Sequence, residues 1–220
     1  MSSWRYRAYS ALKGMAPPVV RNALELQLSS TSGLRQLGWG LSRKLGVPVD
    51  QDGEPIPWYT YPSIRFLEPR IPTDAVVFEY GSGQSTLWWA KRTAKVVSVE
   101  HNREWADRLR RRLPDKAEVL FHDAQSDAYV QAANRYGGRY DIVVIDGRRR
   151  VKSVMNCLDG LSERGVIIWD NSEREYYRGG YEFLAENGFK PPLNFYGLGP
   201  INTEEWCTSV FYKGGNCLGI

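Results

Sequence analysis

From residue 75 onward, short apolar runs rich in β-branched residues alternate with helical segments, and this alternation constrains the fold more than any other feature. We expect strands at 75–80, 95–100, 118–122, 140–146 and 165–170. We expect helices at 85–92, 103–113, 129–136, 151–161 and 180–187, the last ended by Gly188. Such alternation predicts a parallel sheet with helices on both faces.

Two closing strands are expected at 194–196 and 208–213. Because no convincing helix joins them, they should form an antiparallel hairpin at one edge of the sheet. The predicted fold class is therefore α/β, with seven strands that are mostly parallel, a C-terminal antiparallel hairpin and helices on both faces.

The N-terminal fifty residues read as helical pieces broken by turn signals, with an amphipathic helix over 34–45. A turn-rich stretch over 49–57 follows. We therefore divide the chain into a helical extension or lid at 1–55 and a main domain at 56–220. A length of 220 residues suits one α/β domain with such an appendage.

The net positive charge of the chain comes entirely from this N-terminal segment. Residues 1–50 carry a net charge of +5, whereas the whole chain carries +4. This segment is either a solvated helical face or a contact surface for a membrane, an anionic substrate or a second copy in a homodimer. The aromatic and aliphatic residues interleaved with the charges are Trp4, Leu34, Leu37 and Trp39.

The remaining bulk features narrow the class of protein. Three cysteines without CxxC spacing disfavour a disulfide framework or a zinc site and suit a reducing compartment. No apolar run approaches the roughly 18 residues of a membrane span, and no secretory signal is evident. We expect a cytoplasmic protein, with residues 1–50 as the candidate for peripheral membrane contact.

Polar residues at the carboxyl ends of the expected strands are the candidate site, because ligands of open α/β sheets bind there. The first strand runs into a glycine turn that lets a ligand approach the backbone closely. The third glycine of a nicotinamide dinucleotide fingerprint is absent near Thr86. The candidate residues of this turn are Glu79, Tyr80, Gly81, Ser82, Gly83, Ser85 and Thr86.

The next two strand ends also carry acids. Glu100 lies 21 residues after Glu79, a distance at which an acid commonly binds ribose hydroxyls; alternatively it is a helix N-terminal charge beside a capping Asn102. Asp123, followed by Ala124, either accepts a hydrogen bond from an adenine amino group or caps a helix.

The fourth and fifth strand ends should converge. Asp146, Asp170 and Asn171 form an oxygen-rich set suited to Mg²⁺, or they cap the turns after their strands. The run Arg148–Arg150 and Arg174 lie nearby. These basic residues either bind a phosphate, sulfate or carboxylate of a substrate or belong to a solvated loop.

In order, the segments FEYGSGQST, KVVSVEHN, HDA, YDIVVIDG and GVIIWDN resemble the successive motifs of class I S-adenosylmethionine (SAM)-dependent methyltransferases. The resemblance implies a Rossmann-like fold and SAM as cofactor. It implies that Glu79, Gly81 and Gly83 hold the methionine part, Glu100 the ribose, and His101 and Asp123 the adenine. It also brings Asp146 and the rest of the glycine turn into the cofactor-binding set.

The set of Asp146, Asp170 and Asn171 is similar to the metal triad of catechol- and caffeoyl-CoA-type O-methyltransferases, in which a cation lowers the pKa of the substrate hydroxyl. Arg149 stands where those enzymes carry a candidate base, a lysine. Arginine stays protonated and is a poor base. The catalytic candidates are therefore Asp146 and Arg149, with Asp146 as the base if no metal is used.

We expect O-methylation of a small hydroxylated acceptor, such as a sugar, a glycan or a secondary metabolite, in a pocket shaped by residues 58–62 and 197–206. An aminopropyltransferase shares the fold, but the basic DGRRR loop disfavours a polycationic substrate. A nucleic-acid methyltransferase would need a larger basic surface, so no nucleic acid is expected as partner. A non-catalytic binding or scaffold protein remains the alternative from another class.

Overall fold

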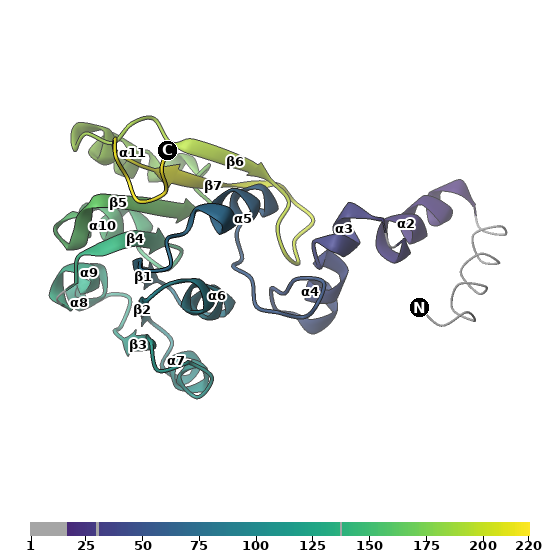
Figure 1. Cartoon of the computed structure of the whole chain (residues 1–220), viewed down its shortest axis with the longest axis horizontal. Helices are drawn as coiled ribbons and strands as arrows, with labels where there is room; N and C mark the ends of the chain where they lie inside the picture. The colour runs from purple at the N-terminus through teal and green to yellow at the C-terminus, as the bar shows by residue number, and fades with distance from the viewer. Residues whose placement is uncertain (1–16, 30, 137) are drawn as a thin grey trace.

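The computed structural model describes residues 17–29, 31–136 and 138–220 (Figure 1). The strands are β1 (Val76–Tyr80), β2 (Lys95–Glu100), β3 (Ala117–Phe121), β4 (Tyr140–Ile145), β5 (Leu161–Asp170), β6 (Leu193–Gly197) and β7 (Trp206–Phe211). The helices are α2 (Pro18–Leu28), α3 (Gly33–Gln36), α4 (Trp39–Leu45), α5 (Tyr61–Leu67), α6 (Gln84–Arg92), α7 (Arg103–Arg110), α8 (Asp127–Val130), α9 (Ala132–Arg135), α10 (Arg150–Met155) and α11 (Arg178–Glu186).

The seven strands form one sheet in the order β3-β2-β1-β4-β5-β7-β6. Strands β1 to β5 pair in parallel, and β7 pairs antiparallel with both β5 and β6. The predicted fold class is therefore confirmed, including the C-terminal hairpin. The strand order changes direction at β1 and β4, so the loops after these two strands leave a crevice where ligands bind in such sheets.

Each face of the sheet packs against its own helices. Val77, Ile142 and Ile168 point to the face covered by α5 and α6, while Phe78 and Val143 point to the face covered by α8 to α11. Side chains of a strand alternate between the two faces, and burial on both sides explains why the parallel strands are almost continuously apolar. This alternation determines which face receives each polar residue at a strand end.

Several element boundaries differ from the prediction. The helix expected over 129–136 is divided into α8 and α9, and the helix expected over 151–161 ends at Met155, followed by a 3-10 turn at Leu158–Gly160. Strand β5 begins at Leu161, four residues earlier than expected, with an irregularity in its pairing to β4. None of these differences moves the carboxyl end of a strand.

The amphipathic helix expected over 34–45 is broken at Gly38. This residue adopts φ +75°, and a Cβ there would lie 2.3 Å from the carbonyl carbon of Asp50. Helix α4, which begins at Trp39, docks on the main body, and the Trp39 Nε1 group donates a hydrogen bond to the Asn202 carbonyl. Helix α2 extends away from the sheet (Figure 1), whereas Leu34 of α3 packs against the core under α5 and α6. The domain division at 55/56 stays a prediction.

Trp4, Arg5, Arg7 and Lys13, which contribute to the predicted N-terminal contact surface, lie outside the described residues. Helix α2 exposes the apolar side chains of Val19, Val20 and Leu26. Among the helices of the described residues, none is both long and apolar enough to cross a bilayer. The membrane and dimer contacts of this segment stay predictions.

Replacing Gly38 with alanine tests the break between α3 and α4. We expect Gly38→Ala to lower the free energy of unfolding by about 2 kcal/mol or more. The alanine would have to adopt a left-handed backbone conformation, and its Cβ would overlap with the backbone of Asp50. The matched control is Gly40→Ala. Gly40 lies inside helix α4, and a Cβ added there would meet no atom within 4 Å. This control should raise stability by about 0.5–1 kcal/mol. Equal effects of the two substitutions in denaturant unfolding would contradict the account.

Candidate functional site

Four acidic residues end four neighbouring strands on one face of the sheet. In β1 the buried Phe78 and Tyr80 point to one face, so Glu79 points to the other. The same alternation places Glu100, Asp146 and Asp170 on the Glu79 face, because the residue before each of them packs into the opposite core. Strand pairing places Ile145 beside Trp169, so Asp146 and Asp170 follow neighbouring residues.

Glu79 is a deeply buried acid, with only 1% of its surface exposed. Its Oε2 atom accepts hydrogen bonds from Thr86 Oγ1 at 2.5 Å and from Ser98 Oγ at 3.0 Å. Burial raises the pKa of Glu79 to about 7, although hydrogen bonds from Ser85, Thr86 and Ser98 oppose this shift. Its Oε1 atom has no hydrogen-bond partner among the described residues. A buried acceptor without a donor is costly, and the amino group of a bound ligand would satisfy it.

The glycine turn and the loop after β4 approach each other closely at the crevice. Gly81 adopts φ +94°, and a Cβ there would lie 3.2 Å from the carbonyl group of Asp146. A Cβ on Gly147 would lie 2.0 Å from the Tyr129 hydroxyl. Both positions therefore require glycine, and the two loops form one backbone cradle beside Glu79 and Asp146.

Glu100 lies at the second strand end, as predicted, and its carboxylate organises the loops around it. The Oε2 atom accepts a hydrogen bond from Ser82 Oγ at 3.0 Å, and Oε1 accepts from the backbone N–H groups of His101 and Asn102 at 2.8 Å. Asn102 also caps α7 by accepting from the Trp105 N–H group. The helix-terminal role is thus present, and Ser82 links this acid to the glycine turn.

Three predicted cofactor-binding residues have other structural partners. The Tyr80 side chain is buried on the opposite face, where its hydroxyl donates to the Val130 carbonyl. Strand alternation directs the Tyr80 side chain away from the acids, so a cofactor contact of this residue would have to be made by its backbone. The Thr86 hydroxyl binds Glu79, and the Ser85 hydroxyl lowers the Glu79 pKa. Thr86 therefore positions the acid from the first turn of α6.

The third strand end is more open than the first two. Asp123 is exposed, and its Oδ1 atom accepts a hydrogen bond from the Gln125 N–H group at 2.7 Å. Ser126 rather than Asp123 caps α8. Asp123 therefore forms a local turn, and its contact with the adenine stays a prediction.

Arg149, a predicted catalytic residue, has a structural role. Its Nη1 atom donates to the carbonyl oxygens of Ala124, Gln125 and Ser126 at 3.0–3.2 Å. These bonds, with an ion pair at 3.9 Å between Arg149 Nη2 and Asp127 Oδ1, tie the loop after β4 to the loop after β3. Arg149 thus points toward the Ala124 loop and not toward the acids, and its catalytic role stays a prediction.

The guanidinium of Arg150 lies among the three residues predicted to bind a metal. Its Nη2 atom donates to Asp146 Oδ1 at 2.9 Å, and its Nη1 atom donates to Asn171 Oδ1 at 3.2 Å and to the Asp170 carbonyl. Asp170 Oδ2 lies 4.0 Å from Nη1. Only 11% of the Arg150 side chain is exposed. The structure thus brings Asp146, Asp170 and Asn171 together, but around a fixed cation of the chain itself.

This arrangement does not fit a divalent cation bound by the same three residues. The second carboxylate oxygen of Asp170, Oδ1, already accepts hydrogen bonds from Trp206 Nε1 at 2.9 Å and Thr208 Oγ1 at 2.7 Å. Mg²⁺ needs several oxygen ligands at about 2.1 Å, whereas the available oxygens here converge on a guanidinium. In the part of the chain that the structure describes, no group of three His, Cys, Asp or Glu residues is arranged as a metal site.

The pKa values of these acids reflect burial. Burial raises the pKa of Asp146 and of Asp170, and for Asp170 the charge of Asp146 adds to this, while Arg150 lowers both. Tyr59 lies near the same acids and is fully buried, and burial together with Glu79 and Asp146 raises the pKa of its phenol. Asp146 is more exposed than Glu79 and Asp170: 23% of its side chain surface is accessible.

Sequence reasoning missed Arg150 and Ser98 as site residues. Ser98 lies two residues before Glu100 on the same strand face, so strand alternation would have found it. Arg150 lies four residues after Asp146, the spacing of a helical ion pair, but the three adjacent arginines gave no reason to prefer one of them.

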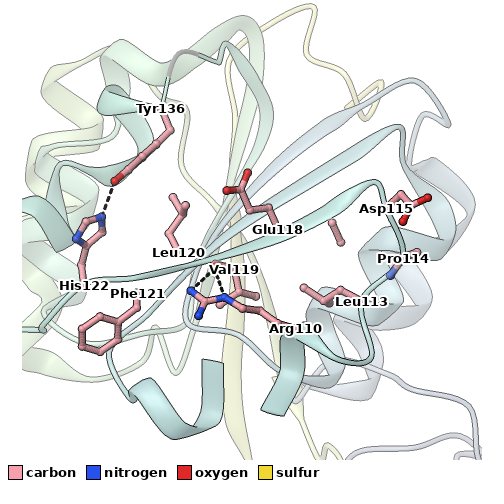
Figure 2. Close-up of a pocket in the computed structure, with 11 residues that line it drawn as sticks. Arg110, Leu113, Pro114, Asp115, Glu118, Val119, Leu120, Phe121, His122 and Tyr136 are labelled. Carbon is pink, nitrogen blue, oxygen red and sulfur yellow. Dashed lines mark hydrogen bonds between the residues drawn. The ribbon is translucent and has the colours of Figure 1, made fainter. Parts of the chain in front are cut away.

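A separate cavity of about 420 Å³ runs along the outer edge of β3, and Figure 2 shows the residues that line it. Arg110 donates two hydrogen bonds to the Val119 carbonyl, and His122 bonds to the Tyr136 hydroxyl at 2.7 Å. Arg110 thereby covers part of an exposed strand edge. None of the predicted site residues lines this cavity, so it is not the candidate active site.

Comparisons with known proteins agree with the geometry. Residues 78–172 match a family model described as a methyltransferase domain, and this segment runs from β1 past Asp170 and Asn171. This match is a similarity to methyltransferase domains over less than half of the chain. The comparison with curated proteins found no match.

Solved structures share the methyltransferase fold. A methyltransferase-like protein from Silicibacter pomeroyi has a TM-score of 0.54 and 22% identity, with 73% of this chain and 89% of that chain covered. A TehB-like SAM-dependent methyltransferase from Corynebacterium glutamicum has a TM-score of 0.51 and 18% identity, with 68% of this chain and 85% of that chain covered. A methyltransferase from Pyrococcus furiosus has a TM-score of 0.52 and 19% identity, with 70% of this chain and 84% of that chain covered.

The domain match and the shared fold agree with the methyltransferase domain that the sequence motifs predicted. The resemblance to catechol- and caffeoyl-CoA-type enzymes is not among these findings and stays a prediction.

Removing the fixed cation tests its role in the acid cluster. We expect Arg150→Ala to lower the free energy of unfolding by about 3 kcal/mol at pH 8, because it leaves two buried carboxylates without a counter-charge. Without Arg150 the folded-state pKa values of Asp146 and Asp170 rise further above their unfolded values near 4. Stability is then lost as pH rises above that value, so the destabilisation should be smaller at pH 5.

The control for this experiment is Arg139→Ala, since Arg139 forms only an exposed pair with Glu163 at 3.9 Å. Its effect should stay below about 0.5 kcal/mol. We also expect Mg²⁺ to raise the melting temperature of Arg150→Ala but not of the natural chain. Stabilisation of the natural chain by Mg²⁺ would contradict the assignment of Arg150 as the cation of this cluster.

Proposed function

We propose that this chain transfers a methyl group from SAM to a hydroxyl oxygen of a small acceptor such as a sugar or secondary metabolite. The observation that carries the proposal is the row of acids on one sheet face, in which Glu79 keeps an unpartnered carboxylate oxygen and Asp146 is partly exposed. SAM supplies an electrophilic methyl group on a sulfonium. All further steps belong to residues of this chain.

The cofactor is held by the first three strand ends. Glu79 Oε1 accepts a hydrogen bond from the amino group of the methionine part, whose positive charge favours the ionised acid. Gly81 and Gly147 allow the backbone to approach the ligand. Glu100 accepts from the ribose hydroxyls, and His101 and Asp123 lie on the adenine side.

Asp146 is the general base of the proposal. It is partly exposed, and its raised pKa brings the carboxylate closer to the range in which a base works near neutral pH. The acceptor hydroxyl donates its proton to Asp146 while its oxygen attacks the methyl group in line. Arg150 keeps Asp146 ionised before the reaction and holds it in place.

The proposal needs no divalent cation, because Arg150 already supplies positive charge at the position predicted for Mg²⁺. The aminopropyltransferase alternative is not favoured, since the loops after β4 and β5 are basic and would repel a polyamine. The scaffold alternative predicts no turnover and is decided by the assays below.

Isothermal titration with S-adenosylhomocysteine, the product form of the cofactor, tests the binding half of the proposal. Glu79→Gln should weaken binding at least about tenfold, because the charge-assisted hydrogen bond to the amino group is lost. The pKa of Glu79 in the ligand-free protein is about 7, so the carboxylate becomes ionised between pH 6 and pH 8. Binding of S-adenosylhomocysteine to the natural chain should therefore tighten over this range, and this dependence should vanish in Glu79→Gln. The exposed Glu118→Gln is the control; absence of binding to the natural chain would overturn the proposal.

Substitution of the base tests the chemical half. With any hydroxylated acceptor found by screening, Asp146→Asn should lower kcat by about 100-fold or more, with little change in S-adenosylhomocysteine affinity. The rate of the natural chain should rise with pH as Asp146 loses its proton. The control is the exposed Asp159→Asn, which should retain full activity. Unchanged kcat in Asp146→Asn would show that another group takes the proton.

A further inference from the structure

A basic cavity of about 400 Å³ adjoins the acid cluster. It is built by the loops after β4 and β5, and of the described residues that line it none is acidic. The lining residues are Gly147, Arg148, Arg149, Arg150, Val151, Lys152, Arg174, Tyr176 and Tyr177. Gly147 follows Asp146 directly, so a molecule in this cavity lies next to the proposed base.

Two of the five basic residues are committed to the protein. Arg149 donates to three carbonyl oxygens of the loop after β3 and lies 3.9 Å from Asp127 Oδ1, and Arg150 is held by the acids at the strand ends. Their charges are balanced or directed away, so they hold the loop in shape. The charge available to a ligand must come from the other three residues.

The remaining three, Arg148, Lys152 and Arg174, have weak partners or none. Arg148 reaches only His101 Nε2, at 3.5 Å, and in the described part of the chain the Lys152 ammonium has no hydrogen bond or ion pair. Arg174 Nε lies 3.9 Å from Glu173 Oε1, and its Nη1 atom donates to the Tyr176 hydroxyl at 3.1 Å. Three cations around one cavity repel one another unless an anion lies between them.

The donor set favours a phosphate group over a carboxylate. A phosphate monoester carries up to two negative charges and three acceptor oxygens, which matches two guanidinium groups and one ammonium better than a single charge does. The cavity is of the size that holds small-molecule ligands, so it has room beyond the phosphate itself. Tyr176, 70% exposed, offers a ring face to a sugar or similar skeleton.

We propose that the acceptor is a phosphorylated, hydroxylated small molecule whose phosphate is bound by Arg148, Lys152 and Arg174. The phosphate anchors the acceptor in this cavity, and one of its hydroxyl groups then reaches Asp146. This inference rests on the proposed function, since it names the substrate class of the same site. It assigns specificity to three side chains outside the set proposed to hold the cofactor.

The test uses the full chain saturated with S-adenosylhomocysteine, so that cofactor binding is measured separately. Inorganic phosphate, inorganic sulfate and acetate are titrated into the natural chain and into the double variant Lys152→Gln/Arg174→Gln. We expect phosphate to bind more tightly than acetate, and the double variant to lose about tenfold or more in phosphate affinity. The matched control is Arg139→Gln, a basic surface residue outside the cavity, which should bind phosphate as the natural chain does.

The second arm measures methyl transfer to pairs of sugars with and without a phosphate, and binding of a short RNA oligonucleotide. Only the phosphorylated member should be methylated, and Lys152→Gln/Arg174→Gln should raise its KM far more than it lowers kcat. Equal phosphate affinity in the double variant and the control, or preference for the unphosphorylated sugar, overturns the inference. Tighter binding of RNA than of any sugar phosphate overturns it in favour of a nucleic-acid substrate. Loss of S-adenosylhomocysteine binding instead overturns the proposed function itself.

Discussion

The pairing of Arg150 with the acids at the ends of β4 and β5 is the interaction on which the site depends. Two carboxylates at adjacent strand ends repel each other, and burial makes their charged forms more costly. The guanidinium offsets both effects because it contacts Asp146, Asn171 and the Asp170 backbone at once. It allows an acid of raised pKa to remain ionised at the mouth of the crevice.

Strand alternation determines which acids share that crevice. Strands β1, β2, β4 and β5, which carry the acids, bury both faces near their carboxyl ends, so the position of one apolar residue determines the side of the next. Glu79, Glu100, Asp146 and Asp170 fall on the same face although they come from four separate strands. An insertion of one residue before any of them would direct that acid into the opposite core and remove it from the site.

The sequence predicted the sheet well because fully buried parallel strands leave a clear apolar signature, and it placed the acids at the correct strand ends. It could not predict the break at Gly38, because the reason is a tertiary contact with Asp50. The sequence also could not show where the side chains of the adjacent residues Arg148, Arg149 and Arg150 point. Arg149 looked like the catalytic substitute because of its spacing, whereas its left-handed backbone conformation, φ 50°, turns it toward the Ala124 loop.

The divergence of these arginines explains how one short loop serves both chemistry and recognition. Arg150 contacts the acids at the ends of β4 and β5, whereas Lys152 and Arg174 line the neighbouring cavity. Arg149 fixes the loop through three carbonyl oxygens and an ion pair at 3.9 Å with the exposed Asp127. A negative cluster and a positive cavity therefore lie side by side, which suits the proposed acceptor: its anionic group binds in the cavity while its hydroxyl gives up a proton to Asp146 and attacks the methyl group.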